Sequence, residues 1–108
     1  MEQILNLTPH AIDIYRDGEV IRTIYPTGLA RCNSTEQSEE FIDGIPVIKV
    51  EYGDVTGLPE QQPGIYYIVS SITAQAAARS GRTDLLVPSK LVRDDWNAVI
   101  GCEIFCQL

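Results

Sequence analysis

The chain has 108 residues, enough for one ordinary domain and too few for two independent hydrophobic cores, so we predict a single domain over residues 1–108. Its apolar fraction of 44% argues against disorder, and its net charge of −7 disfavours binding to duplex nucleic acid or to an anionic membrane. No apolar run approaches the length of a membrane span, and the first residues lack a basic flank followed by a hydrophobic signal core, so we expect a cytoplasmic protein that contacts no membrane.

Two Asp-Gly pairs in the first half of the chain predict β-hairpins, because both positions of a tight hairpin turn need residues that tolerate a positive φ. The flanking strand-like runs are Ala11–Arg16 with Glu19–Tyr25 around Asp17-Gly18, and Ser38–Ile42 with Ile45–Tyr52 around Asp43-Gly44. Pro46 opens the last of these runs and lacks a backbone N–H, which indicates an edge strand.

The middle of the chain predicts a loop, a buried strand and one helix. Residues 53–64 hold three Gly and two Pro and read as a long loop. The run Ile65–Val69 is apolar on both faces, as expected of a central strand that is covered on both sides. A helix should follow from about Ile72 to Ser80, with Ser70 or Ser71 as its N-cap and Gly81 as its stop.

The last third predicts short strands at Leu85–Val87 and near Leu91–Arg93, a turn over Asp94–Asn97, and a final strand at Val99–Phe105. These elements together predict an α+β fold. We expect a mainly antiparallel, twisted sheet of about six to eight strands, built from β-hairpins, with one short helix packed on it.

The three cysteines and the single histidine give no metal-binding signature, so we expect no metal and no cofactor. On one strand, Cys102 and Cys106 would lie roughly 13 Å apart, beyond the reach of a disulfide. We therefore expect reduced thiols in Cys102, Cys106 and Cys32.

The strand-to-helix junction at Ser70-Ser71 is the main candidate for a ligand site. A helix N-terminus has unpaired N–H groups and a partial positive charge, and it attracts anions such as phosphate. Four of the eight basic residues, Arg79, Arg82, Lys90 and Arg93, follow within a short stretch. Arginine binds phosphate through its planar fork, but ion pairs of Arg82 with Asp84 and of Arg93 with Asp94 are an equally open alternative.

Three residues outside this cluster complete the candidate site: Thr8, His10 and Trp96. His10 follows Thr8-Pro9 between two strand-like stretches, where it would contact a ligand, act as an acid or base, or simply bond a backbone carbonyl through its ring. Trp96 lies in a turn, where its ring would stack on a base or fill a subunit interface. Ser70 and Ser71 would cap the helix or contact the phosphate in addition.

Several motifs are similar to those of a family of small uncharacterised proteins encoded by phages and prophage-like elements. They are Asn6-Leu-Thr-Pro-His-Ala-Ile12, Tyr67-Ile-Val-Ser70, Arg82-Thr-Asp84 with Pro88, and Val92-Arg93-Asp94. In the last turn this chain has Asp-Trp-Asn where such relatives have a glycine. The resemblance implies a phage accessory protein that acts on host physiology. Small phage proteins that antagonise host immunity include oligomers that sequester nucleotide signals such as cyclic ADP-ribose derivatives.

Three functional hypotheses follow from these observations. The first is a non-enzymatic homo-oligomer that binds and sequesters a small phosphorylated ligand, such as a cyclic dinucleotide or a cyclic ADP-ribose derivative, to counter host defence. The second is an inhibitor of a host protein, since residues 1–63 hold eleven acidic and four basic residues and would present acidic hairpins to a basic target. The third is a small nucleotide hydrolase with His10 as its base.

Overall fold

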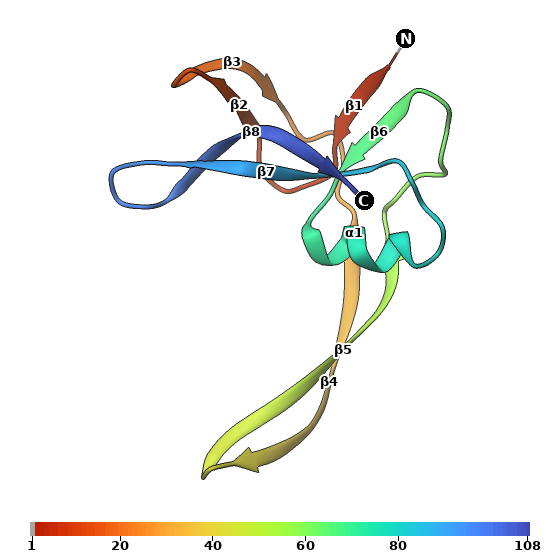
Figure 1. Ribbon diagram of the computed structural model, residues 1–108. Coiled ribbons are helices and arrows are strands. Elements are labelled where there is room, and N and C mark those ends of the chain that lie inside the picture. Colours follow the sequence, from red (N-terminus) through yellow and green to blue (C-terminus); the bar gives the residue numbers. More distant parts are fainter. Residues whose placement is uncertain (1) are drawn as a thin grey trace.

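The computed structural model describes residues 2–108 and, among these, all side chains except those of Gln37 and Ser38. This part of the chain forms eight strands and one short helix (Figure 1). In chain order they are β1 (Gln3–Asn6), β2 (Ile12–Arg16), β3 (Glu19–Ile24), β4 (Arg31–Ile42), β5 (Ile45–Thr56), β6 (Ile65–Ile68), α1 (Ser71–Ala78), β7 (Leu85–Arg93) and β8 (Val99–Gln107). The α+β expectation is thus confirmed.

The main sheet has six strands in the order β1-β6-β7-β8-β2-β3, and it is mixed. Strand β6 runs parallel to both β1 and β7, and β2 runs parallel to β8, while β7/β8 and β2/β3 are antiparallel. The expectation of a mainly antiparallel sheet is therefore met only in part, because three of the five strand pairings in this sheet are parallel. Its parallel pairs join strands that are distant in sequence, and such pairs leave no turn signature of the Asp-Gly kind.

Strand β6 is covered on both sides, as its sequence predicted. Tyr67 and the following Val69 pack against Ala74 and Ala77 of α1, and the small alanine side chains let the helix lie close to the sheet. Ile68 points to the opposite face and is also fully buried. The sheet curls, and a single parallel bridge between Asn6 and Pro26 ties its first strand to the segment after β3.

Strands β4 and β5 form a separate two-stranded antiparallel hairpin, which we call the arm. It projects away from the sheet, with α1 beside its base (Figure 1). The turn at its tip has positive φ at Asp43 (51°) and Gly44 (76°), as the Asp-Gly pair predicted. Because of the arm, the Cα radius of gyration is 16.5 Å, against about 13 Å for a compact chain of this length.

Other element bounds differ from the sequence prediction in ways that tertiary contacts explain. Both arm strands are longer than predicted, so that β4 begins at Arg31 and the first residues of the predicted loop, up to Thr56, belong to β5. The two short strands predicted around Pro88 are one strand, β7, which bends where Lys90 has φ 48°. Strand β8 pairs with it on both sides of this bend and holds it together.

Candidate functional site

A cavity of about 400 Å³ lies between the base of the arm and the first turn of α1; we call it the arm–helix cavity. It is next to the carboxyl ends of the parallel strands β1 and β6, the edge at which open α/β sheets bind ligands. Its lining residues come from the loop after β1, the arm and the helix: Pro9, Leu29, Ala30, Arg31, Cys32, Ser34, Tyr52, Ser70, Ile72 and Thr73.

The start of the helix has the features of an anion site. Ser70 is the N-cap, as predicted, with extended backbone angles (φ −64°, ψ 156°). Its Oγ accepts a hydrogen bond from the Thr73 N–H (3.3 Å) and donates one to Thr73 Oγ1 (2.9 Å). The remaining N–H groups of the first turn have no acceptor within the helix, and no acidic side chain stands in that turn to offset its partial positive charge.

The lining of the arm–helix cavity contains one basic side chain, Arg31, and no acidic one. Four other cavities each include a carboxylate in their lining, namely Glu2, Asp13, Asp54 or Asp84. In a chain with a net charge of −7, this concave surface therefore favours an anion.

The arm contributes an aromatic side chain to the same cavity. Tyr52 is 49% exposed and lies opposite Ser34 in the arm ladder, so that both side chains are on one face of the ribbon. Cys32 follows on that face opposite Val55, which packs against the hydrophobic core. The cavity thus brings together a helix N-terminus, an arginine and an aromatic ring from three separate parts of the chain.

The arginines predicted for the site do not gather at the helix start. Arg79 is the C-cap of α1, at the opposite end of the helix from Ser70 and roughly 13 Å away along the axis. Arg93 donates from Nη1 to the carbonyl of Asn97 (2.9 Å) in the β7–β8 turn. Trp96 lies in that turn and is 87% exposed.

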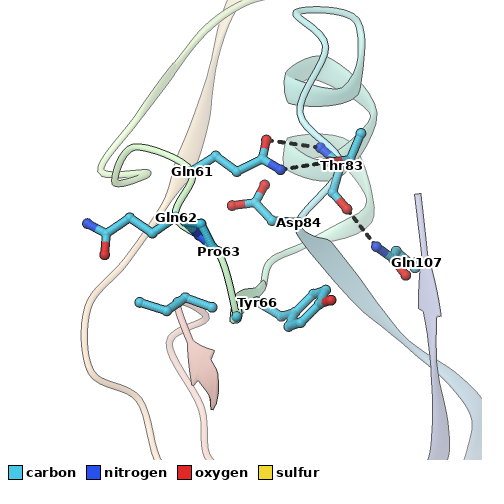
Figure 2. Close-up of a pocket in the computed structure, with 9 residues that line it drawn as sticks. Gln61, Gln62, Pro63, Tyr66, Thr83, Asp84 and Gln107 are labelled. Carbon is cyan, nitrogen blue, oxygen red and sulfur yellow. Dashed lines mark hydrogen bonds between the residues drawn. The ribbon is translucent and has the colours of Figure 1, made fainter. Parts of the chain in front are cut away.

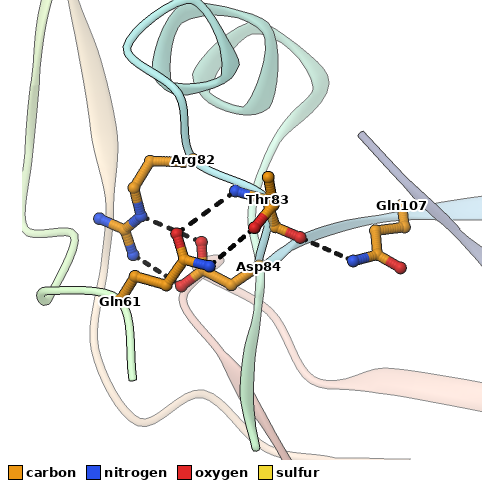
Figure 3. Close-up of polar contacts among 5 residues, drawn as sticks. All are labelled: Gln61, Arg82, Thr83, Asp84 and Gln107. Carbon is orange, nitrogen blue, oxygen red and sulfur yellow. Dashed lines mark hydrogen bonds and ion pairs between the residues drawn. The ribbon is translucent and has the colours of Figure 1, made fainter. Parts of the chain in front are cut away.

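Arg82 forms an ion pair with Asp84, the structural alternative that the sequence left open. Nη2 and Nε of Arg82 donate to the two carboxylate oxygens of Asp84 at 2.7 and 3.0 Å (Figure 3). Asp84 is buried, with 3% of its surface exposed. The hydrogen bonds from Arg82 to Asp84, with the charge of that carboxylate, raise the pKa of the guanidinium above its ordinary value. The guanidinium of Arg82 therefore has a structural partner in Asp84.

A second cavity, of about 300 Å³, lies at the amino ends of β6 and β7, with Asp84 and Tyr66 in its wall (Figure 2). Three of its polar residues, Gln61, Thr83 and Gln107, are bonded to one another. Gln61 donates from Nε2 to Thr83 Oγ1 (2.7 Å), and Gln107 donates to the Thr83 carbonyl (2.6 Å) (Figure 3). These bonds connect the loop before β6 and the end of β8 to the loop after α1. We therefore assign these polar residues a structural role.

The N-terminal motif is also used for structure. The amide of Asn6 is fully buried, donates to the carbonyls of His10 (2.8 Å) and Ile24 (3.0 Å), and accepts from the backbone N–H (2.9 Å) and the hydroxyl (2.6 Å) of Thr8. Thr8 is thus engaged in a turn that ties β1 to β2 and β3. The side chain of His10 is exposed and borders a cavity of about 250 Å³, which Leu91 also lines and which is distinct from the arm–helix cavity.

Of the predicted site residues, the structure thus brings only Ser70 into the lining of the arm–helix cavity, with Ser71 next to it in the first helical turn. Arg31 and Tyr52 were missed, since no spacing in the sequence shows that the base of the arm lies beside the start of the helix. Among the described residues, no three His, Cys, Asp or Glu side chains gather closely enough to hold a metal ion. No helix in this part of the chain has the length and apolar character to cross a membrane.

Comparison of the chain with protein-family models, with curated proteins and with solved structures gives no match.

Proposed function

We propose that this protein is a non-enzymatic binding protein that holds a small phosphorylated ligand in the arm–helix cavity. The observation that carries the proposal is the lining of that cavity, which joins a helix N-terminus to a basic side chain and contains no acidic residue. Helix N–H groups and an arginine fork are the donors that proteins commonly use for phosphate oxygens.

The cavity also suits the remainder of a nucleotide. Its volume of about 400 Å³ lies within the range of small-molecule sites, roughly 300–1,000 Å³. The partly exposed ring of Tyr52 provides a face on which a base would stack, while Arg31 and the first turn of α1 hold the phosphate. Because the chain resembles phage proteins, we propose that the ligand is a nucleotide immune signal. The protein would sequester this signal in the cytoplasm of a host cell.

Sequestration fits the arrangement better than hydrolysis. The hydroxyl of Ser70 is bonded to Thr73, and the imidazole of His10 borders a different cavity. A nucleophile and its base would need to lie within hydrogen-bond reach of one another. The lining of the arm–helix cavity does not bring such a nucleophile and base together, so we propose that the ligand is bound and not hydrolysed.

Calorimetry with a panel of cyclic dinucleotides and cyclic ADP-ribose derivatives tests the proposal. We expect Arg31→Ala to weaken binding by about 10- to 100-fold, because a charge-assisted hydrogen bond contributes about 1.5–3 kcal/mol. Arg79→Ala is the matched control, since it removes the same charge at the far end of the same helix and should leave the affinity unchanged.

Absence of binding to every member of the panel would refute the proposal. Recovery of the ligand after incubation separates the two remaining possibilities. Intact ligand supports sequestration, whereas a hydrolysed product that disappears in His10→Ala supports the hydrolase.

A further inference from the structure

One face of the arm carries a row of exposed apolar side chains along β5, with Glu36 and Glu39 opposite two of them on β4. The ladder pairs Phe41 with Pro46, Glu39 with Ile48, Glu36 with Val50 and Ser34 with Tyr52, and side chains of directly paired residues share a face. The apolar members of this face are largely uncovered: Phe41 is 69% exposed, Ile48 45%, Val50 43% and Tyr52 49%. We call these four residues with Pro46 the arm face.

An isolated ribbon of this kind is not stable by itself. A single two-stranded hairpin is marginal in water, and it needs further strands or a packed layer to hold it. Beyond Val55, which reaches the core, every described side chain from Asn33 to Asp54 is exposed. The contacts within this chain therefore do not account for the stability of an extended arm. We infer that the arm is stabilised by a contact with another molecule.

The exposed area of the whole chain gives the size of the missing contact. The chain exposes 7615 Å². A folded monomer of 12.0 kDa is expected to expose about 6,000 Å², so the excess is about 1,600 Å². Stable interfaces bury roughly 800 Å² per partner, and obligate homodimers bury more. The excess is thus as large as the surface that one subunit loses in an obligate assembly.

We propose that the arm face is an interface with a second copy of this chain. The arm needs a contact from outside the chain whenever the chain is folded, and a second copy of the same chain is the partner that is always present. Closed homo-oligomers are also the commonest assemblies. The body of the chain also exposes apolar side chains that a copy would bring: Leu91, Trp96, Val99, Ile100 and Ile104 of the β7–β8 hairpin.

The second copy would also complete the ligand site. Tyr52 belongs both to the arm face and to the lining of the arm–helix cavity, so a subunit seated on the arm would wall the open side of that cavity. This consequence rests on the proposed function. The proposed association of two copies does not rest on ligand binding, and its test needs no ligand. The association and the ligand binding can therefore be refuted separately.

Sedimentation equilibrium of the full chain tests the interface. We expect a multiple of the 12.0 kDa chain mass at micromolar concentration. Ile48→Lys and Val50→Lys should shift the protein to 12.0 kDa, because each removes an apolar contact and would bury an ion pair with the facing Glu39 or Glu36, whose desolvation is costly. Thr35→Lys is the control, since Thr35 is exposed on the opposite face of the same ribbon, and it should keep the wild-type mass. A wild-type protein that stays monomeric, or an assembly that both arm-face variants retain, would overturn the proposal.

Hydrogen exchange of the wild-type protein keeps the test decisive if those variants do not fold. Amides of β4 and β5 should exchange more slowly as the concentration rises from about 1 to about 100 µM, because association protects the arm. Exchange in the arm that is fast and independent of concentration would contradict the interface. A monomer whose arm is protected only by a foreign basic protein would instead support the host-protein inhibitor.

Discussion

At the scale of single residues, Asn6 supports the turn that follows β1, because its buried amide bonds groups of that turn and of β3. We expect Asn6→Ala to lower the free energy of unfolding by about 3 kcal/mol, since it removes the amide donor to the buried carbonyl of Ile24 and the acceptor of the Thr8 N–H and hydroxyl. Urea denaturation measures this loss. Thr8→Val should cost only about 1 kcal/mol, because it removes one hydroxyl while the backbone bond to Asn6 remains. Equal losses in the two variants would contradict this account of the motif.

The cysteines should differ in reactivity according to their burial. Burial raises the pKa of the Cys102 thiol, although a backbone hydrogen bond with Ser89 partly offsets this effect. Cys106 is exposed. At pH 8 we expect a thiol reagent to modify Cys106 rapidly and Cys102 only in denaturant, as peptide mass spectrometry would reveal. Similar rates at both sites would contradict this prediction.

The same raised pKa gives a pH dependence of stability. The unfolded chain releases the Cys102 proton at the ordinary thiol pKa, whereas the folded chain retains it to a higher pH. The contribution to the free energy of unfolding is therefore complete below the ordinary thiol pKa and is lost as the pH rises from that value to the raised one. Replacing Cys102 by Ala should remove this decline from the stability profile.

At the scale of elements, the base of the arm depends on Gly57, the residue directly after β5. Gly57 and Gly18 both have φ +81°, but a Cβ on Gly57 would overlap the carbonyl oxygen of Leu29, whereas a Cβ on Gly18 meets nothing within 4 Å. Gly18→Ala should therefore cost only the left-handed strain, about 1–2 kcal/mol. Gly57→Ala should cost at least about 3 kcal/mol, because the backbone must also move.

Urea denaturation of both glycine variants measures this difference. If the two variants lose the same stability, the close contact of Gly57 with Leu29 does not hold the base of the arm.

At the scale of the whole molecule, an arm that is stabilised by association makes thermal stability depend on concentration. The melting temperature of the wild-type chain should rise over a hundredfold increase in protein concentration, because mass action favours the assembly that contains only folded chains. Differential scanning fluorimetry checks this expectation. The Val50→Lys variant should show a lower melting temperature that does not change with concentration.

Much of the local structure followed from short-range chemistry. The Asp-Gly pairs predicted both hairpins because few other dipeptides tolerate positive φ at two successive positions. The serines and Gly81 predicted the helix to within about two residues, because caps act over one turn. The apolar run at Ile65–Val69 predicted a doubly covered strand, and β6 is one.

The candidate site was predictable only in part. The sequence identified Ser70 and the helix start, but it placed the positive charge in Arg79, Arg82 and Arg93, which lie near the helix in sequence. In the structure Arg82 forms an ion pair with Asp84. The basic residue beside the helix start is Arg31, about forty residues earlier in the chain. A contact over such a separation leaves no local pattern, because it depends on how the arm meets the body.

By itself, then, the sequence determined the hairpin turns, the helix caps, the buried strand and the acidic balance of the chain, since each depends on a side chain and its immediate neighbours. Only the tertiary structure decided the parallel pairing of β6, the separation of the arm from the sheet, and the meeting of Arg31 and Tyr52 with the helix start. These features depend on packing between segments that are distant along the chain, and no local propensity specifies which of them come together.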